Sequence, residues 1–118
     1  MVHDPCLKLR LFCHSKNTYE FVWCLQNWKR IAPALLNRQD PLLVLAFLEI
    51  CRLLNGASHS MLTDLLKVNQ PMESKLAVKL RQLGWIRSAR ARAARGSMEI
   101  LTPRGLRFLK AVEEQIRK

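Results

Sequence analysis

Three prolines mark the starts of predicted helices and so constrain how this chain can fold. Pro41 directly follows Asp40, and Pro103 directly follows Thr102. An Asp or Thr oxygen accepts a free backbone N–H at a helix start, and proline in the first helical turn loses no helical hydrogen bond. Pro71 falls in the first turn of a further apolar-periodic segment. Helices are therefore predicted to begin near residues 41, 70 and 103.

The N-terminal part, residues 1–56, is predicted to hold two helices. In the first, residues 18–36, apolar side chains recur at spacings of four and three and form one stripe. These are Phe21, Leu25, Trp28, Ala32 and Leu35. The spacing is also that of a coiled-coil seam, which makes this helix a candidate dimer contact. The second helix, 41–54, is apolar nearly all round, as expected of a central helix, and Asn55 and Gly56 supply its stop.

The C-terminal part, residues 57–118, is predicted to contain two short helices joined by a tight link at 68–69. The first is Ser60–Lys67, with Ser60 as its cap and Leu62, Leu65 and Leu66 facing inward. The second is 70–83, with Glu73 favoured by the helix dipole and Gly84 as its end. Its predicted inward stripe is Met72, Leu76, Leu80 and Leu83. Two helices joined in this way match a helix-turn-helix, whose second helix enters the DNA major groove.

A hairpin and a closing helix are predicted to follow. The strands are Trp85–Arg92 and Met98–Thr102, around a tip at 93–96, and such a hairpin makes a wing. The closing helix has an inner face of Leu106, Leu109, Val112 and Ile116. The sequence thus predicts one mostly α-helical domain over 1–118, a winged helix-turn-helix with a small β-hairpin.

The charge of the chain points to an anionic partner. Twenty Lys and Arg residues against nine Asp and Glu residues give a formal net charge of +11. Residues 75–118 hold twelve of the basic side chains and only three acids. Because so short and basic a chain favours nucleic acid, we expect double-stranded DNA as the partner.

The segment from Ala57 to Leu109 resembles the MarR-type winged-helix transcription regulators. The resemblance is carried by an ordered run of residues: Ser74, Lys75, Leu80, Gly84, Trp85, Ile86, Arg87, Ile100, Leu101, Thr102 and Gly105. It implies a homodimer held by the terminal helices and a sequence-specific regulator, a repressor reading a palindromic operator. It also implies a redox role for a thiol near the first helix, where Cys13 and Cys24 lie; the alternative is that these thiols fill the core.

Ten polar side chains are predicted to contact DNA. Gln70, Ser74, Lys75 and Lys79 are placed near the start of the reading helix, where glutamine suits adenine and lysine suits guanine. Glu73 is predicted to cap the helix instead. Arg87, Arg90, Arg92 and Arg95 form the densest basic cluster, suited to the minor groove or to phosphates, and Arg104 and Arg107 are predicted to add phosphate contacts. The alternative is that these charges only solvate an exposed face.

Other classes of function are weakly supported. His3, His14 and His59 have no nucleophile or carboxylate partner at a suggestive spacing, so no enzyme is predicted. Cys6, Cys13, His14 and Cys24 lack the paired spacing of a zinc site, so neither a metal nor another cofactor is predicted. The longest apolar stretch, 41–48, is too short to span a bilayer, and no signal peptide is recognised, so a cytoplasmic protein without membrane contact is expected.

Two further functions remain open. Winged helices also serve as protein-interaction adaptors, in which a basic face meets an acidic protein. The same basic surface would also suit non-specific nucleic-acid binding in replication or in plasmid or chromosome maintenance. Tyr19, Trp23 and Trp28 are candidates for lining a small-molecule effector pocket, with core packing as the default.

Overall fold

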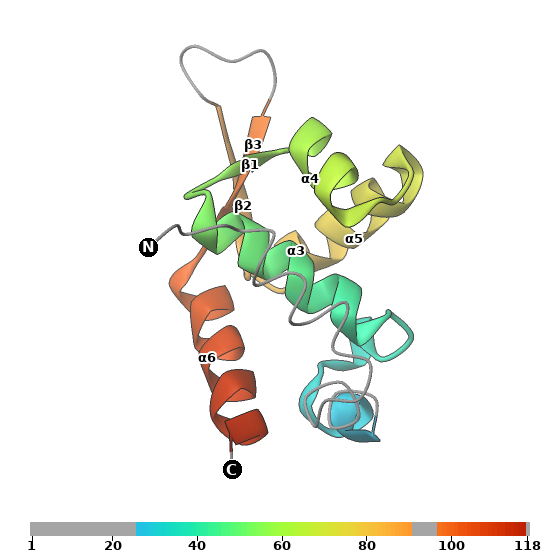
Figure 1. Cartoon of the computed structure of the whole chain (residues 1–118), viewed down its shortest axis with the longest axis vertical. Coiled ribbons are helices and arrows are strands. Elements are labelled where there is room, and N and C mark those ends of the chain that lie inside the picture. Colours follow the sequence, from blue (N-terminus) through green and yellow to red (C-terminus); the bar gives the residue numbers. More distant parts are fainter. Residues whose placement is uncertain (1–25, 91–96, 118) are drawn as a thin grey trace.

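A computed structural model, which describes residues 26–90 and 97–117, shows a mostly helical chain with a small antiparallel sheet (Figure 1). Residues 26–31 are helical. The elements that follow are the 3-10 helix η1 (Ala34–Leu36), α3 (Pro41–Leu53), β1 (Ala57–Ser58), α4 (His59–Leu66), α5 (Gln70–Gln82), β2 (Ile86–Arg90), β3 (Ser97–Leu101) and α6 (Pro103–Arg117). The predicted mostly helical chain with a small β-hairpin is confirmed. This set of elements is compatible with a winged helix.

Helix α3 is the central element of the core. Its cap is the predicted one, since Asp40 Oδ1 accepts a hydrogen bond from the backbone N–H of Leu42 at 3.0 Å. Every side chain from 44 to 51 is buried, and α3 packs against α4, α6 and β3. Figure 1 shows α3 crossing the middle of the molecule. Asn55 and Gly56 end it with φ angles of 55° and 119°, as their tolerance of left-handed backbone predicts.

The sheet contains a strand that the sequence did not predict. Its order is β1-β3-β2, with β3 pairing antiparallel to both neighbours. Strand β1 has only two residues, too few for a periodic apolar signal. The hairpin strands lie within one residue of their predicted starts, and the predicted tip at 93–96 lies outside the described residues. Pairing of β1 with β3 therefore ties the sheet to the start of α4, which directly follows β1.

Helices α4 and α5 are separated by residues 67–69. The predicted cap at Ser60 is wrong: Ser58 Oγ accepts from Met61 N at 3.2 Å, because Ser58 is the extended last residue of β1. Lys67 ends α4 in the left-handed conformation, with φ 56°. Asn69 then caps α5 through its Oδ1, which accepts from Met72 N at 2.9 Å. Caps on both sides make this connection short and well defined.

The first predicted helix ends earlier than its periodicity suggested. Helical backbone ends at residue 31, and Pro33, which is extended and has no N–H, separates it from η1. Residues 18–25 lie outside the described part of the chain. Trp28 is core: its Nε1 donates to the Leu36 carbonyl at 2.8 Å, and its ring meets Phe108 of α6 edge to face. This contact brings the N-terminal helix and α6 together.

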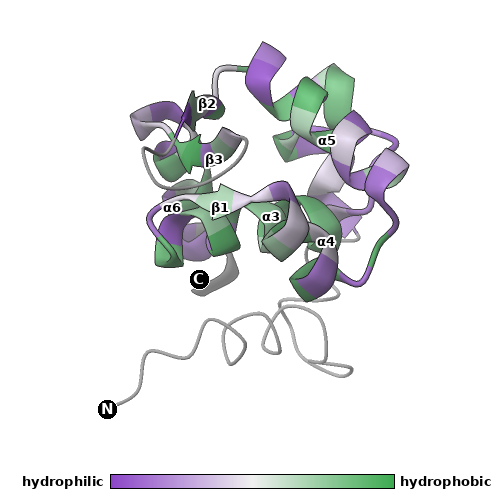
Figure 2. Ribbon diagram, turned by 90° about the horizontal axis from the view of Figure 1, so that it is seen from above, coloured by the Kyte–Doolittle hydropathy of each residue, from purple (hydrophilic) through white to green (hydrophobic). Residues whose placement is uncertain are grey.

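Helix α6 starts as predicted and returns along the core. Thr102 Oγ1 accepts from Gly105 N at 3.2 Å, and Leu109 and Val112 are buried. The ring of Phe108 stacks on Trp85 with 4.1 Å between centroids. Viewed from above, α6 and the hairpin lie to one side of α3, while α4 and α5 lie to the other (Figure 2). This arrangement leaves one long side of α5 free.

Candidate nucleic-acid interface

The free side of α5 carries the predicted reading residues. Its buried side consists of Glu73, Leu76, Ala77 and Leu80. Gln70 and Lys75 are exposed, and Ser74 and Lys79 are partly exposed. One predicted member of the inward stripe is wrong, because Met72 is 50% exposed. Met72 precedes Glu73 and so lies about 100° round the helix from it, beside the buried side and not within it.

Side chains on α5 fall into two groups by the direction they face. Arg81 reaches the hairpin, where its Nη1 donates to Ser88 Oγ at 2.9 Å. Ser74 lies seven residues before Arg81, about two helical turns, so it shares the side that faces the hairpin. Lys75 and Val78 face away from the core, with Val78 45% exposed. An exposed valine at this position was not anticipated from the sequence.

The arginines predicted on the wing do not share one face of the hairpin. Successive side chains of a strand point to opposite faces, so Ser88 and Arg90 share one face and Arg87 lies on the other. Since Ser88 contacts Arg81, the face of Ser88 and Arg90 is the one turned toward α5. Arg90 and Arg87 are both exposed. Arg90 therefore extends the α5 surface, whereas Arg87 lies on the opposite face of the hairpin.

Arg104 and Arg107 are exposed but lie apart from the N-terminal end of α5. Both lie in the first turns of α6, directly after β3, at the end of the hairpin that is opposite its turn. Arg104 extends over the C-terminal end of α5: a Cβ built on Gly84 would meet its Nη1 at 3.3 Å. A 13-residue helix is about 20 Å long, so this arginine is far from Gln70. A cation at a helix C-terminus also stabilises that helix, so Arg104 has a structural role.

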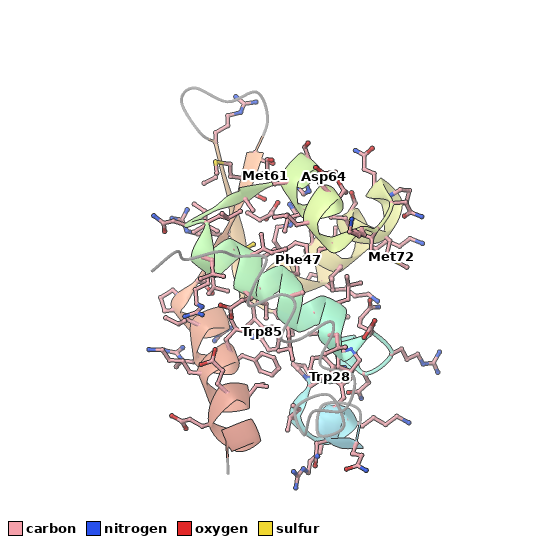
Figure 3. The ribbon with its side chains drawn as sticks, viewed as in Figure 1. Trp28, Phe47, Met61, Asp64, Met72 and Trp85 are labelled. Carbon is pink, nitrogen blue, oxygen red and sulfur yellow. The ribbon has the colours of Figure 1, made fainter. Side chains whose placement is uncertain are left out.

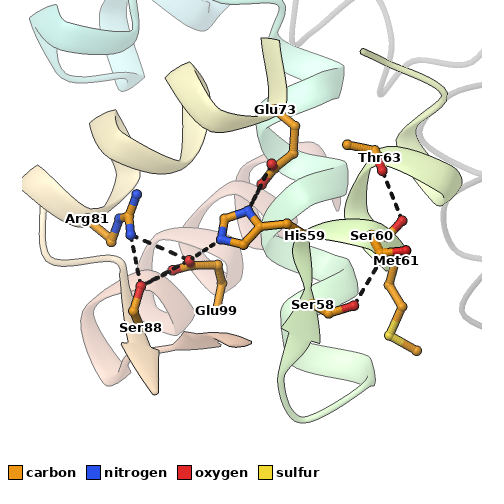
Figure 4. Close-up of polar contacts among 9 residues, drawn as sticks. All are labelled: Ser58, His59, Ser60, Met61, Thr63, Glu73, Arg81, Ser88 and Glu99. Carbon is orange, nitrogen blue, oxygen red and sulfur yellow. Dashed lines mark hydrogen bonds and ion pairs between the residues drawn. The ribbon is translucent and has the colours of Figure 1, made fainter. Parts of the chain in front are cut away.

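The acidic side chains of this region point inward. Glu73 and Glu99 are completely buried, and both contact the ring of His59 (Figure 4). The distances are 2.7 Å from His59 Nδ1 to Glu73 Oε2 and 3.0 Å from Nε2 to Glu99 Oε2. Two predictions are thereby corrected: Glu73 binds a histidine and does not cap the helix, and His59 has two carboxylate partners. Sequence spacing hid them, because 14 and 40 residues separate these partners from His59.

The buried cluster leaves an exposed surface of one sign of charge. Across the described residues of α5, β2 and β3, every acid is buried, while exposed or partly exposed cations remain. These cations are Lys75, Lys79, Arg81, Arg87 and Arg90. Ser88 Oγ donates to Glu99 at 3.0 Å, and Arg81 lies 3.6 Å from the same carboxylate. Because the carboxylates are satisfied internally, the charged side chains that the described part of this surface exposes are all cations.

Several residues predicted as site members lie outside the part of the chain that the structure describes. Arg92, Arg95, Cys13 and Cys24 lie outside the described residues. Cys51 is buried, as expected of a core thiol, and burial together with the charges of Glu99 and Glu73 raises its pKa to about 12. Among residues 26–90 and 97–117, no group of three or more His, Cys, Asp or Glu side chains is placed to hold a metal ion.

A second surface feature is apolar. An open groove of about 320 Å³ lies between α3, α4 and the start of α5. It is lined by Asp40, Leu42, Leu43, Ala46, Leu65, Leu66, Val68 and Met72. Figure 3 shows Met61, Asp64 and Met72 on the α4 and α5 side of the molecule, whereas Phe47, Trp28 and Trp85 lie inside. The basic surface and the apolar groove therefore share one helix, α5.

In the part of the chain that the structure describes, no helix combines the length and the apolar character needed to cross a membrane. A comparison of the sequence with protein-family models gives no match, and a search of curated proteins gives no significant match.

Proposed function

We propose that this protein is a sequence-specific DNA-binding transcription regulator in which α4 and α5 form a helix-turn-helix and the β2–β3 hairpin is the wing. One observation carries the proposal: every acidic side chain of α5 and the described hairpin is buried, while Lys75 and Arg90 are exposed. DNA binding draws its affinity from cations that neutralise phosphates, and an exposed carboxylate would oppose it. The net charge of +11 supports the same partner.

The exposed groups of α5 suit base recognition in the major groove. Gln70 is suited to pair with adenine and Lys75 with guanine, and both are exposed near the helix start. Ser74 lies between them on the side facing the hairpin and is suited to either base. Lys79, one turn further on, is suited to a phosphate. Arg90 projects from the same side of the hairpin as α5 and is assigned to the minor groove or to its flanking phosphates.

The proposal includes a homodimer that acts as a repressor. A palindromic operator places two half-sites about 34 Å apart, so two reading helices would enter successive major grooves. The N-terminal helix and α6 meet through Trp28 and Phe108, and these terminal helices are the proposed dimer contact. Bound over a promoter, such a dimer would exclude polymerase sterically. No membrane contact, cofactor or catalytic activity is part of this proposal, and the effector is left open.

The test is duplex binding by fluorescence anisotropy at several salt concentrations, after selecting preferred duplexes from a random pool. Lys75→Ala and Ser74→Ala are expected to lose discrimination between selected and random duplexes. Arg90→Ala is expected to weaken binding to selected and random duplexes equally. If Arg90 contacts one phosphate, the slope of log affinity against log salt concentration should become shallower by about 0.9. Arg38→Ala, in the exposed turn before α3, removes one cation away from α5, the hairpin and the proposed dimer helices; it is the control for Lys75→Ala and should leave discrimination unchanged.

The outcomes separate the alternatives. If the selected duplexes are palindromes and both α5 variants lose the preference for them, the result supports a sequence-specific regulator. If the protein binds all duplexes with equal affinity, it is a non-specific nucleic-acid binder and not a sequence-specific regulator. No binding to any duplex at low salt rejects DNA as the partner.

A second candidate function is a protein-interaction adaptor, favoured by the apolar groove between α3, α4 and α5 and by the half-exposed Met72 at its edge. In this case Arg90→Ala leaves duplex binding unchanged, whereas Leu43→Asp in the groove abolishes capture of a protein partner. Competition between a partner and duplex DNA for the wild-type protein would show whether the two surfaces act together.

A further inference from the structure

A single imidazole ring joins two buried carboxylates that come from the two proposed DNA-binding elements. Glu73 is in the first turn of α5, and Glu99 is in the middle of β3. Both side chains are fully buried, whereas His59 is 31% exposed. Figure 4 shows the ring between them, with Nδ1 directed to Glu73 and Nε2 directed to Glu99. His59 is the first residue of α4, so three elements meet at this ring.

The protonation state of the ring decides whether both contacts are attractive. A neutral imidazole has one N–H donor and one acceptor nitrogen, whereas the imidazolium ion has two donors. A carboxylate only accepts. With both ring nitrogens within 3.0 Å of carboxylate oxygens, the doubly protonated ring satisfies both partners. A neutral ring would set one nitrogen lone pair against a buried carboxylate, an arrangement that is costly away from water.

The contacts continue from this ring to the hairpin and back to α5. Ser88 Oγ donates to Glu99, and Arg81 donates to Ser88 while lying 3.6 Å from Glu99. On the α3 side, burial and the negative charges of both carboxylates raise the pKa of Cys51 to about 12, so this thiol stays neutral. Among residues 26–90 and 97–117, the charged groups that contact this cluster are therefore the two carboxylates and the guanidinium of Arg81.

These contacts hold the proposed DNA-reading groups in a fixed relation. Glu73 lies one and two residues before Ser74 and Lys75, the proposed base readers. Glu99 pairs in register with Ser88, two residues from Arg90 on the same face of the hairpin. Any change in the distance between the carboxylates therefore changes the distance between the reading helix and the wing. DNA grooves have a fixed spacing, so this distance bears on affinity.

We propose that His59 is a positioning residue: in its doubly protonated form it holds the start of α5 and the hairpin at the spacing that specific DNA binding requires, which couples operator affinity to pH. This inference rests on the proposed function. Raising the pH removes the proton, loosens the link between the two elements, and lowers affinity for the specific duplex more than for random duplex.

The experiment measures the anisotropy of a selected and a random duplex at several pH values between about pH 6 and pH 9. The full-length wild type, His59→Gln, His59→Lys and Ser60→Ala are compared. Wild type and Ser60→Ala are expected to lose about tenfold in specific affinity over this range, equivalent to about 1.4 kcal/mol. Ser60 is exposed, is adjacent in α4 and takes no part in the cluster through its side chain, so it is the matched control.

The histidine variants make the test specific. Glutamine donates through one amide group only, so His59→Gln should bind the selected duplex weakly at every pH, with a reduced ratio of specific to random affinity. A lysine ammonium has three donors and keeps its charge, so His59→Lys should retain specific affinity at pH 9. Circular dichroism and thermal unfolding show that each variant is folded.

The results distinguish this inference from the proposed function. If His59→Gln shows the same pH profile and the same specific-to-random ratio as wild type, His59 has no positioning role, although the protein remains a DNA-binding protein. If the wild type binds no duplex at any pH, the proposed function fails and this inference fails with it.

Discussion

Gly105 offers a test in which the structure reverses what helix propensity predicts. It is the third residue of α6, its φ lies outside the left-handed region, and it is buried. Alanine is favoured over glycine within helices by about 1 kcal/mol, so propensity alone predicts that Gly105→Ala stabilises the protein. The structure argues otherwise, because a Cβ at this position would lie 2.3 Å from the Trp85 carbonyl oxygen and 2.6 Å from Leu101 Cδ1.

The size of the effect follows from which atoms have to move. Overpacking costs about 1–3 kcal/mol, and occasionally more, when neighbours cannot shift cheaply. The Trp85 carbonyl oxygen cannot shift cheaply, because it already accepts a hydrogen bond from Thr102 N at 3.0 Å, at the end of the hairpin opposite its turn. We therefore take about 3 kcal/mol for the clash. Subtracting the gain of about 1 kcal/mol in propensity leaves a net loss of about 2 kcal/mol, or a fall in Tm of about 8 °C for a domain of this size.

Thermal and urea unfolding of Gly105→Ala, followed by circular dichroism, measure this loss. Gly84→Ala is the comparison: its φ of 73° makes any side chain strained, but its nearest neighbour is the flexible end of Arg104. We expect Gly84→Ala to lose about 1–2 kcal/mol, mainly through backbone strain. A Tm for Gly105→Ala equal to or above that of wild type would refute the packing argument.

Three further changes test other parts of the fold. Thr102→Val removes the cap of α6 and a hydrogen bond of 2.5 Å to the Gly84 carbonyl, and should lower the free energy of unfolding by about 1–2 kcal/mol in urea titrations, whereas Thr102→Ser should lose little. Leu80→Ala should lose about 2–5 kcal/mol because Leu80 is fully buried, while the exposed Val78→Ala in the same helix should change stability by less than about 0.5 kcal/mol. Cys51, whose pKa is raised from 9.0 to about 12, should resist maleimide at pH 8 in the folded protein and react once urea unfolds it, as peptide mapping would show. Its contribution to stability should be present below pH 9 and be lost between pH 9 and pH 12, because the unfolded chain releases its thiol proton first.

Local signals predicted the order of the elements well. Asp40 with Pro41 and Thr102 with Pro103 start α3 and α6 as expected, and the positive φ of Gly84 ends α5. These features depend on side chains that bond to backbone groups within a few residues, so they can be recognised without the fold. The same locality explains the errors. The cap at Ser58 could not be predicted from local sequence, because the strand that makes Ser58 extended is held by pairing with Met98, 40 residues away.

The candidate site was predicted less completely. The exposed positions of Gln70 and Lys75 follow from helical periodicity, and the structure agrees with it. The division of Arg87 and Arg90 between two faces follows from strand alternation, which counting charges in the sequence overlooked. The roles of His59 and Glu99 had no sequence signal, since nothing in their local sequence marks either as part of a buried cluster.

Residues near one another in the chain are enough to predict the starts of α3 and α6, the hairpin and the basic character of the C-terminal half. Which charges face outward depends instead on how the helices and strands pack. Glu73 and Glu99 look like ordinary surface acids in the sequence, yet packing brings both to one imidazole and removes them from the exposed surface. The cost of burying a charge without a partner is what makes that arrangement depend on all three elements together.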